Sequence, residues 1–174
     1  MKLEYTIKEN DNYINVKEVW KAYFHISDRL LLKLKKSQNI FLNGTPIYVS
    51  KEVTTHEKIS VTIDFDEDNS NIVPTKLNLN IIYEDEYYLV VNKSFNTPVH
   101  PSMLHYENSL SNGVKYYFDL IGLHKKIRPV NRLDKDTSGI VIFAKNEYIQ
   151  ECLVSQMKTK DFQKEYIAIC DGIF

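Results

Sequence analysis

The stretch RPVNRLDKDTSGIVIFAK, residues 128–145, decides the fold of the second half of the chain. Its segment IVIF, residues 140–143, is a run of β-branched and aromatic side chains, which is typical of a buried strand. The preceding segment KDTSG consists of residue types that favour turns. The stretch therefore predicts a turn that leads directly into a strand, with the carboxylates of Asp134 and Asp136 on the turn.

Two interpretations of this turn follow from its residue types. In the first, the polar residues serve only to reverse the chain between two strands. In the second, Asp134, Asp136 and Ser138 bind calcium, because their spacing matches the first, third and fifth positions of an EF-hand loop. The twelfth position of such a loop is a glutamate, whereas this chain has Lys145 there, and a β-branched strand stands in place of the helix. The pattern therefore excludes a calcium loop.

The rest of the second half alternates between strand and helix patterns. Leu77, Leu79 and Ile81 alternate with polar residues, which predicts a strand, and residues 87–91 predict the next one. Further elements are expected from capping residues and apolar spacing. They are a helix at residues 109–121 that ends at Gly122, a helix that begins after Asn146, and a strand at residues 165–170.

The first half has the pattern of a separate small unit. Alternation at residues 3–7 and 59–63 predicts two strands, and Asn43-Gly44 between apolar runs predicts a hairpin. Asn15 and Ser27 are expected to be the N-caps of two helices between the first strand and the hairpin.

A polar segment separates the two halves. Residues 64–76 are acidic and contain Pro74, so we expect them to connect two units. The fold class is therefore mixed α+β, with a small α/β domain followed by a second domain that contains both strands and helices. The expected boundaries are 1–65 for the first domain, 66–76 for the linker and 77–174 for the second domain.

The composition is that of a soluble globular protein. Of the 174 residues, 43% are hydrophobic and 26% are charged, which are ordinary values for a folded domain. The net charge of −1 gives no overall attraction to nucleic acid, so any basic surface must be local. The chain lacks the apolar segment of a secretory signal and any run close to the roughly 20 apolar residues that cross a bilayer. We therefore expect a cytoplasmic protein without a membrane partner.

Metal ligands and disulfides have little support in the sequence. The only cysteines are Cys152 and Cys170, which form no CxxC pair. The five histidines are scattered and show no HExxH spacing. We expect neither a disulfide nor a metal site.

The segment NRLDKDTSG resembles the motif HRLDxxTSG of the RluA-type RNA pseudouridine synthases. EDEYYLVVNK followed by VHPS resembles the family's opening strands, and KEYIAICDG resembles its KxYxAxxxG segment, in the same order. The resemblance implies an enzyme that isomerises uridine in RNA to pseudouridine without a cofactor. It implies Asp134 as the catalytic nucleophile, Arg132 as the residue that fills the space of the extruded base, and Tyr166 as the aromatic side chain that packs on that base.

The chain departs from the family pattern at two positions and in its length. Asn131 replaces the usual His before Arg132, and Ser94 replaces the Pro that commonly follows the Asn-Lys pair. The family's catalytic domain also continues beyond its KxYxA strand, where it supplies an Arg that pairs with the catalytic Asp. The resemblance therefore implies the N-terminal part of a larger catalytic domain with a mixed, mainly antiparallel sheet, and an active site that is incomplete within these residues.

Residues 14–64 resemble the small RNA-binding domain that a ribosomal small-subunit protein shares with these synthases. The resemblance implies structured RNA, ribosomal or transfer, as the partner, and we expect the full-length protein to be a monomer. A solvated helix face is the alternative interpretation of the basic residues in this domain. The alternative function is a non-catalytic RNA-binding module, an inactive remnant of such an enzyme. The residues expected to bind RNA phosphates are Arg29, Lys33, Lys35 and Lys36.

Overall fold

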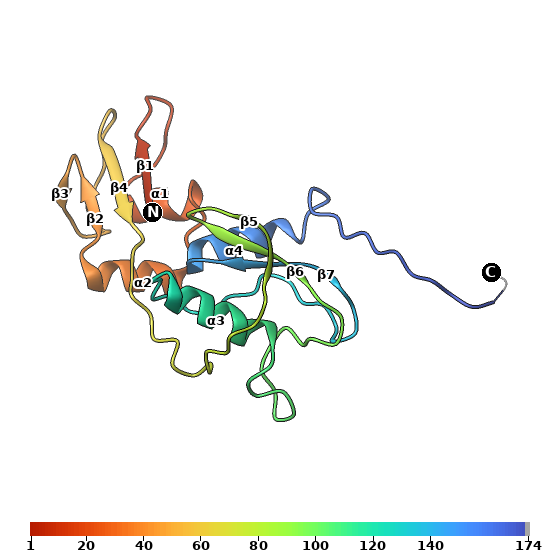
Figure 1. Ribbon diagram of the computed structural model, residues 1–174. Helices are drawn as coiled ribbons and strands as arrows, with labels where there is room; N and C mark the ends of the chain where they lie inside the picture. Colours follow the sequence, from red (N-terminus) through yellow and green to blue (C-terminus); the bar gives the residue numbers. More distant parts are fainter. Residues whose placement is uncertain (173–174) are drawn as a thin grey trace.

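The first 63 residues form an antiparallel sheet with two helices packed against it, in a computed structural model that describes residues 1–172 (Figure 1). The strand order is β1-β4-β2-β3. We call this part the first unit. Its strands are β1 (Lys2–Thr6), β2 (Ile40–Leu42), β3 (Thr45–Pro46) and β4 (Lys58–Thr62), and its helices are α1 (Val16–Ala22) and α2 (Asp28–Ser37).

Local signals in the sequence explain where these elements begin and end. The side chains of Asn15 and Ser27 accept hydrogen bonds from backbone N–H groups in the first turns of α1 and α2, at 3.1 and 3.2 Å. Asn43 and Gly44 have φ angles of +49° and +82° in the turn between β2 and β3, a conformation that Asn and Gly adopt most easily. The predicted N-caps and the predicted hairpin are therefore confirmed.

The core of the first unit lies between the sheet and the helices. Trp20 of α1, Leu34 of α2, and Ile59 and Val61 of β4 have no exposed surface. Burying one such side chain stabilises a fold by roughly 2 kcal/mol. The amphipathic pattern of the two helices therefore has its expected partner in the sheet.

A second sheet, of three antiparallel strands in the order β5-β6-β7, follows the connecting segment. Leu89 and Val91 of β6 lie opposite Phe143 and Val141 of β7, and all four pack with Phe118 in a second core. We call this part the second unit. Its elements are β5 (Asn80–Glu84), β6 (Tyr88–Lys93), α3 (Leu110–Leu120), β7 (Gly139–Ala144) and α4 (Glu147–Gln156).

The two helices of the second unit lie where the sequence predicts them. Gly122 follows α3 with a φ of +70°, and the side chain of Asn146 caps α4 with a 2.9 Å hydrogen bond. Gly113 lets α3 approach the chain ahead of β5, because a Cβ at this position would lie 3.0 Å from the Cβ of Leu77. No helix within residues 1–172 has the length and apolar character that crossing a membrane requires.

The strands of the second unit differ from the prediction at two places. The strand expected from residue 77 begins only at Asn80, because Leu77 packs on α3 instead. The strand expected at residues 165–170 is absent: this segment extends away from both units (Figure 1), and Ile167 and Ile169 are fully exposed, at 101% and 102%. A strand needs a neighbour that satisfies its backbone hydrogen bonds. Within residues 1–172 no strand pairs with residues 165–170.

The connecting segment is held against the second unit along its length. The backbone N–H of Glu67 donates to the carbonyl of His124 at 3.0 Å, and the side chain of Asn69 donates to the carbonyl of Lys125 at 2.9 Å. Further along, the N–H of Thr75 donates to a carbonyl in α3 at 3.2 Å. The path from the first unit to β5 is therefore fixed by hydrogen bonds.

Candidate active site

Asp134 lies on a tight turn that leads into β7. The N–H of Thr137 donates to the carbonyl of Asp134 at 3.1 Å and closes the turn. β7 begins two residues later at Gly139, which pairs with Lys93 at the end of β6. Asp134 and Arg132 are both exposed, so the turn presents a carboxylate and a guanidinium to solvent next to the end of the second sheet.

Lys93 fixes this turn from inside the protein. Its residue is 1% exposed, and its ammonium donates hydrogen bonds to the carbonyls of Ser94, Thr97 and Lys135 at 3.0, 2.8 and 2.9 Å. The N–H of Thr97 donates to the same Lys135 carbonyl at 3.1 Å. Lys93 therefore joins the loop after β6 to the turn that carries Asp134.

The charge of Lys93 is balanced by the turn that it holds. Burial lowers the pKa of Lys93, and the nearby charges of Asp136 and Asp134 oppose that change. Three carbonyl acceptors use all three ammonium donors, so the buried group has the hydrogen bonds that a buried cation needs. The two carboxylates of the turn thus face a fixed positive charge beneath them.

Sequence reasoning did not identify Lys93 as a residue of the site, although a signal for it was present. Leu89, Val91 and Lys93 are buried in alternation along β6. Because side chains two residues apart point to the same face of a strand, a Lys in step with two core residues is expected to enter the core. A lysine in that position requires acceptors or anions around it.

Asn131 holds the chain just before Arg132. Its amide nitrogen donates to the carbonyl of Ile140 at 2.9 Å, and its side-chain oxygen accepts from the N–H of Ile142 at 2.9 Å. The N–H of Val130 donates to the carbonyl of Ile142 at 2.7 Å. Residues 128–131 therefore follow the outer edge of β7, and the Asn that departs from the family motif serves as a backbone-like partner of this strand.

The loop after β6 also approaches Arg132. Partial desolvation lowers the pKa of His100, and the positive charge of Arg132 lowers it further. The imidazole of His100 is therefore held neutral near pH 7, and it adds no second positive charge to the surface around the turn.

Tyr166 does not join this group. Its side chain is 64% exposed on the segment that extends from α4 (Figure 1), and no hydrogen bond of the described residues links it to the turn. Nor does Asp134 form an ion pair with any described residue. Of the three residues that the resemblance assigns to the site, the structure brings Asp134 and Arg132 onto one turn and leaves Tyr166 apart.

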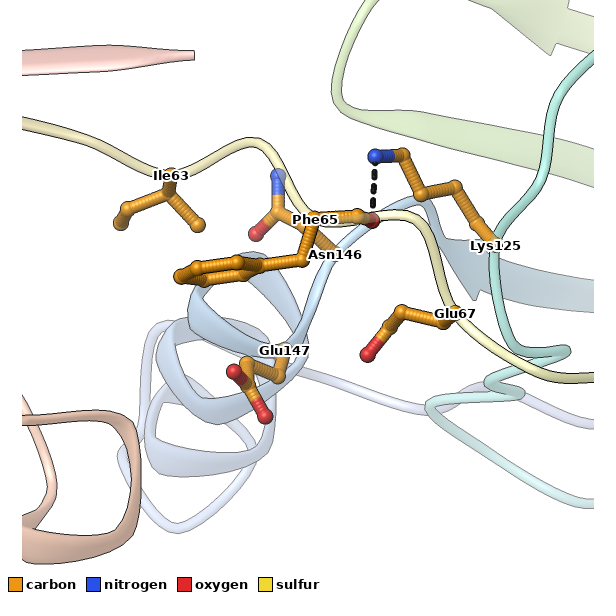
Figure 2. Close-up of a pocket in the computed structure, with 6 residues that line it drawn as sticks. All are labelled: Ile63, Phe65, Glu67, Lys125, Asn146 and Glu147. Atoms are coloured by element: carbon orange, nitrogen blue, oxygen red, sulfur yellow. Dashed lines mark hydrogen bonds between the residues drawn. The ribbon is translucent and has the colours of Figure 1, made fainter. Parts of the chain in front are cut away.

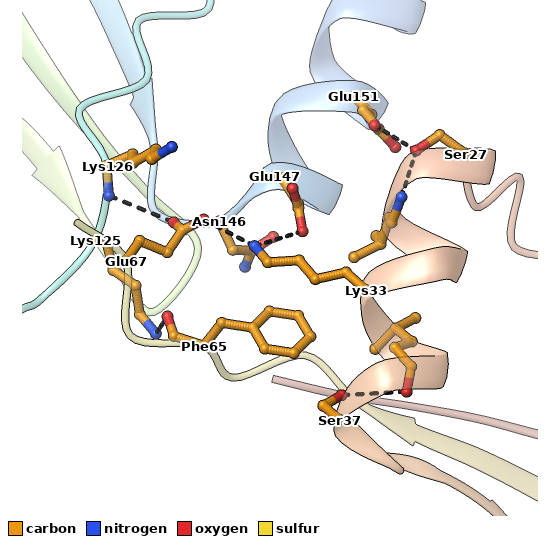
Figure 3. Close-up of polar contacts among 12 residues, drawn as sticks. Ser27, Lys33, Ser37, Phe65, Glu67, Lys125, Lys126, Asn146, Glu147 and Glu151 are labelled. Atoms are coloured by element: carbon orange, nitrogen blue, oxygen red, sulfur yellow. Dashed lines mark hydrogen bonds and ion pairs between the residues drawn. The ribbon is translucent and has the colours of Figure 1, made fainter. Parts of the chain in front are cut away.

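The basic residues of α2 divide between two surfaces. At about 100° per residue, Arg29 and Lys36 lie opposite the buried leucines of the helix, and they are exposed, as is Lys35 on one flank. Lys33 lies on the other flank, where its ammonium donates to Glu67 and to a carboxylate of α4, each at 3.0 Å (Figure 3). The expected role of Lys33 as a phosphate ligand conflicts with these contacts, because both partners already neutralise its charge.

An open hollow lies beside the exposed flank of α2. Lys35 and Gln38 at the end of the helix line it together with Ile47 and Tyr48 after the hairpin. The side chain of Tyr48 is 84% exposed, so a flat aromatic face stands beside a cation. This combination suits a nucleotide, whose base stacks and whose phosphate is anionic.

The described residues contain no cluster of three or more His, Cys, Asp or Glu side chains with the arrangement of a metal site. The exposed side chains around Asp134 are those of Arg132, Lys135, Asp136 and Ser138. They offer charges of both signs and a hydroxyl group for hydrogen bonds to a substrate.

Comparison with known proteins gives a consistent set of relatives. A family model described as RNA pseudouridylate synthase matches residues 87–174. A protein of Borreliella burgdorferi named ribosomal large subunit pseudouridine synthase D is 37% identical over 186 residues, covering 100% of this chain and 56% of the relative. The Bacillus subtilis protein named uncharacterized RNA pseudouridine synthase YlyB is 33% identical over 141 residues, covering 79% of this chain and 46% of the relative.

The solved structures add a weaker similarity. Human RNA Pseudouridylate Synthase Domain Containing 1 shares 26% identity over 47% of this chain and 28% of that chain, with a TM-score of 0.38, which is too low to establish a common fold. The chain spans about half the length of the curated relatives it matches.

Proposed function

Because the chain belongs to the RNA pseudouridylate synthase family, we propose that it contributes the N-terminal part of the catalytic domain of an enzyme that isomerises uridine in RNA to pseudouridine. Asp134 is the nucleophile in this proposal. The single observation that supports it best is the turn itself: an exposed carboxylate stands on a turn that the buried Lys93 anchors through the carbonyl of Lys135.

The reaction fits a site with one reactive carboxylate and no cofactor. The bond between ribose C1′ and uracil N1 breaks, the uracil turns, and a new bond joins C1′ to C5, while the C5 proton is lost and N1 gains one. A carboxylate can form a covalent intermediate or stabilise the positive charge that develops on the sugar. Asp134 is suited to either role because its carboxylate is exposed on the turn.

Arg132 and Tyr166 have the roles of substrate-binding residues in this proposal. A uridine inside folded RNA must leave its stack to reach Asp134, and the proposal gives Arg132, two residues away in sequence, the role of occupying the space that it leaves. Tyr166 supplies an aromatic face for the base. Since it lies on an exposed segment, its role requires that segment to close over the turn when the site is complete.

The first unit is proposed to be an RNA-binding domain at residues 1–65, joined by the linker 66–76 to a catalytic domain at 77–174. Its contact surface is the exposed face of α2 together with Tyr48. Cations there bind phosphates with little dependence on base sequence, and Tyr48 gives a base a stacking partner. The cations are Arg29, Lys35 and Lys36.

The name of the Borreliella burgdorferi relative favours large-subunit ribosomal RNA over transfer RNA as the substrate. Cytoplasmic location and a monomeric full-length protein complete the proposal. The rival function is that of an RNA-binding module without turnover. The exposed position of Tyr166 and the lack of a described cationic partner for Asp134 favour the rival for the 174 residues alone.

One experiment separates the two functions. The purified chain is incubated with transcripts of large-subunit ribosomal RNA, and pseudouridine is measured by mass spectrometry after nuclease digestion. Pseudouridine that forms with the wild-type chain and not with Asp134→Asn supports the enzyme. RNA binding by both proteins, with no pseudouridine from either, supports the binding module. Equal turnover by both proteins would refute the role of Asp134.

A further inference from the structure

Glu67 of the connecting segment is the centre of a buried ion-pair network between the two units. Its carboxylate accepts two hydrogen bonds from the guanidinium of Arg128, at 2.5 and 2.6 Å. It accepts a third from the ammonium of Lys33 in α2, at 3.0 Å (Figure 3). The side chains of Glu67 and Arg128 are only 7% and 9% exposed. One carboxylate therefore binds a cation of the first unit and a cation of the second.

Helix α4 completes the network from the second unit. Glu147 in its first turn accepts a hydrogen bond from Lys33 at 3.0 Å, and Glu151 one turn later accepts one from Ser27, the N-cap of α2, at 2.6 Å. Two cations and two carboxylates thus meet at the centre, so that the charges of the partly buried Lys33 and the buried Arg128 are balanced by Glu67 and Glu147.

Apolar packing closes the same interface. Phe65 and Tyr148 pack against the core of the first unit from the connecting segment and from α4. The ammonium of Lys33 lies 4.5 Å from the centre of the Phe65 ring, a cation–π distance. The hollow that Figure 2 shows between Phe65, Glu67 and Glu147 has a volume of about 10 Å³, at the lower limit for one water molecule. The space is filled by the protein and is not a ligand site.

Glu67, Arg128 and Glu147 have little access to solvent, which distinguishes this network from ordinary surface ion pairs, whereas the side chain of Lys33 is 35% exposed. A buried ion pair that loses one partner leaves the other charge desolvated and uncompensated. Because Glu67 is held on the second unit and Glu147 belongs to it, separating the units would leave Lys33 without either of its carboxylates. The network therefore opposes separation and favours one relative orientation of the two units.

We propose that Glu67 locks the first unit onto the second, so that the cationic face of α2 and the turn of Asp134 are held at a fixed separation and contact one RNA molecule together. Glu67 is then a positioning residue that limits which uridines reach Asp134. The RNA part of this inference rests on the proposed function. The locking of the units does not depend on it.

The locking is tested by ¹⁵N relaxation of the intact chain, which gives a rotational correlation time for each unit. In the wild type, residues 1–63 and 77–157 are expected to share one value. In Glu67→Gln, the value for residues 1–63 is expected to fall to roughly half, as for a small domain on a flexible tether. Asp66→Asn is the matched control, since it removes an exposed carboxylate of the same segment and should leave the shared value unchanged.

Two results would overturn the locking. One is a wild-type protein whose units already tumble separately, and the other is a Glu67→Gln protein that keeps a single correlation time. If Glu67→Gln does not fold, Lys33→Gln replaces it, because this variant removes the cation on the other side of the network. Amide shifts of β1 and β6, which lie in the two separate sheets, report whether each unit remains folded.

A hydroxyl-radical footprint on large-subunit ribosomal RNA tests the positioning. The wild type is expected to protect two sites at a fixed spacing, whereas Glu67→Gln keeps one site and loses at least half of the protection at the other. An identical footprint from the two proteins would refute positioning by Glu67. A wild-type protein that protects no RNA, with one shared correlation time, would refute the proposed function and leave the locking supported.

Discussion

Replacing Glu67 by Gln is expected to destabilise the protein by about 3 kcal/mol at pH 7. Burial by itself would raise the pKa of Glu67, but hydrogen bonds and charge from Arg128 and Lys33 outweigh it and lower the pKa from 4.5 to about 2. Each pH unit of such a difference corresponds to about 1.4 kcal/mol of preference for the ionised form. Gln has the shape of the protonated acid, so the variant loses this preference.

The stability that Glu67→Gln loses depends on pH in a defined direction. A carboxyl whose pKa is lower in the folded state stabilises the fold above its unfolded pKa, and this contribution disappears as the pH falls through the folded pKa. For Glu67 the contribution is complete above about pH 5, declines from 4.5 downward and is nearly gone at pH 2. The difference in unfolding free energy between wild type and Glu67→Gln should shrink over the same range.

Urea denaturation followed by circular dichroism at pH 7, 5, 4 and 3 measures this difference. Asp66→Asn serves as the control: its carboxylate is exposed, and its loss should change the stability by no more than about 0.5 kcal/mol at any of these pH values. A difference for Glu67→Gln that stays below about 1 kcal/mol at pH 7, or that does not change with pH, would show that the network contributes little beyond surface ion pairs.

Three further outcomes are expected. In a full-length version of the protein, Asp134→Asn should reduce pseudouridine formation by at least about a hundredfold, because it removes the nucleophile, while the RNA dissociation constant measured by filter binding stays within a few-fold. Lys93→Met should speed amide hydrogen exchange of Thr97 at least about tenfold, since the carbonyls around it lose their donor, and exchange in the first unit serves as the control. Replacing the three exposed cations of α2 by Ala should lower the slope of log Kd against log salt by about 2 to 3, and an unchanged slope would identify a merely solvated face. These cations are Arg29, Lys35 and Lys36.

Most of the helices and strands followed from short-range chemistry. Caps at Asn15, Ser27 and Asn146 and the Asn43-Gly44 turn depend on a residue and its nearest neighbours. The strand predicted at residues 165–170 failed because a strand is a property of two segments. An alternating pattern shows that a face is available, but not that a partner lies beside it.

The candidate site was predictable only in part for the same reason. Asp134 and Arg132 share a turn because they are close in sequence. The place of Lys33 depends on Glu67, which is 34 residues away, and periodicity in α2 gives no sign of it. The burial of Lys93 could be predicted from the sequence, because its alternation with Leu89 and Val91 puts a charge on the core face of β6.

The run of residues 128–131 along the outer edge of β7 determines how the second sheet can grow. The Asn131 side chain and the backbone of Val130 already bind the backbone groups of Ile140 and Ile142 on that side. A strand from another chain therefore cannot form hydrogen bonds with these residues of β7. Any strand added to this sheet, from a continuation of the same polypeptide or from a second molecule, must enter beside β5. The bulge between Ile81 and Tyr83 interrupts that edge, and it restricts such an addition to a short and specific register.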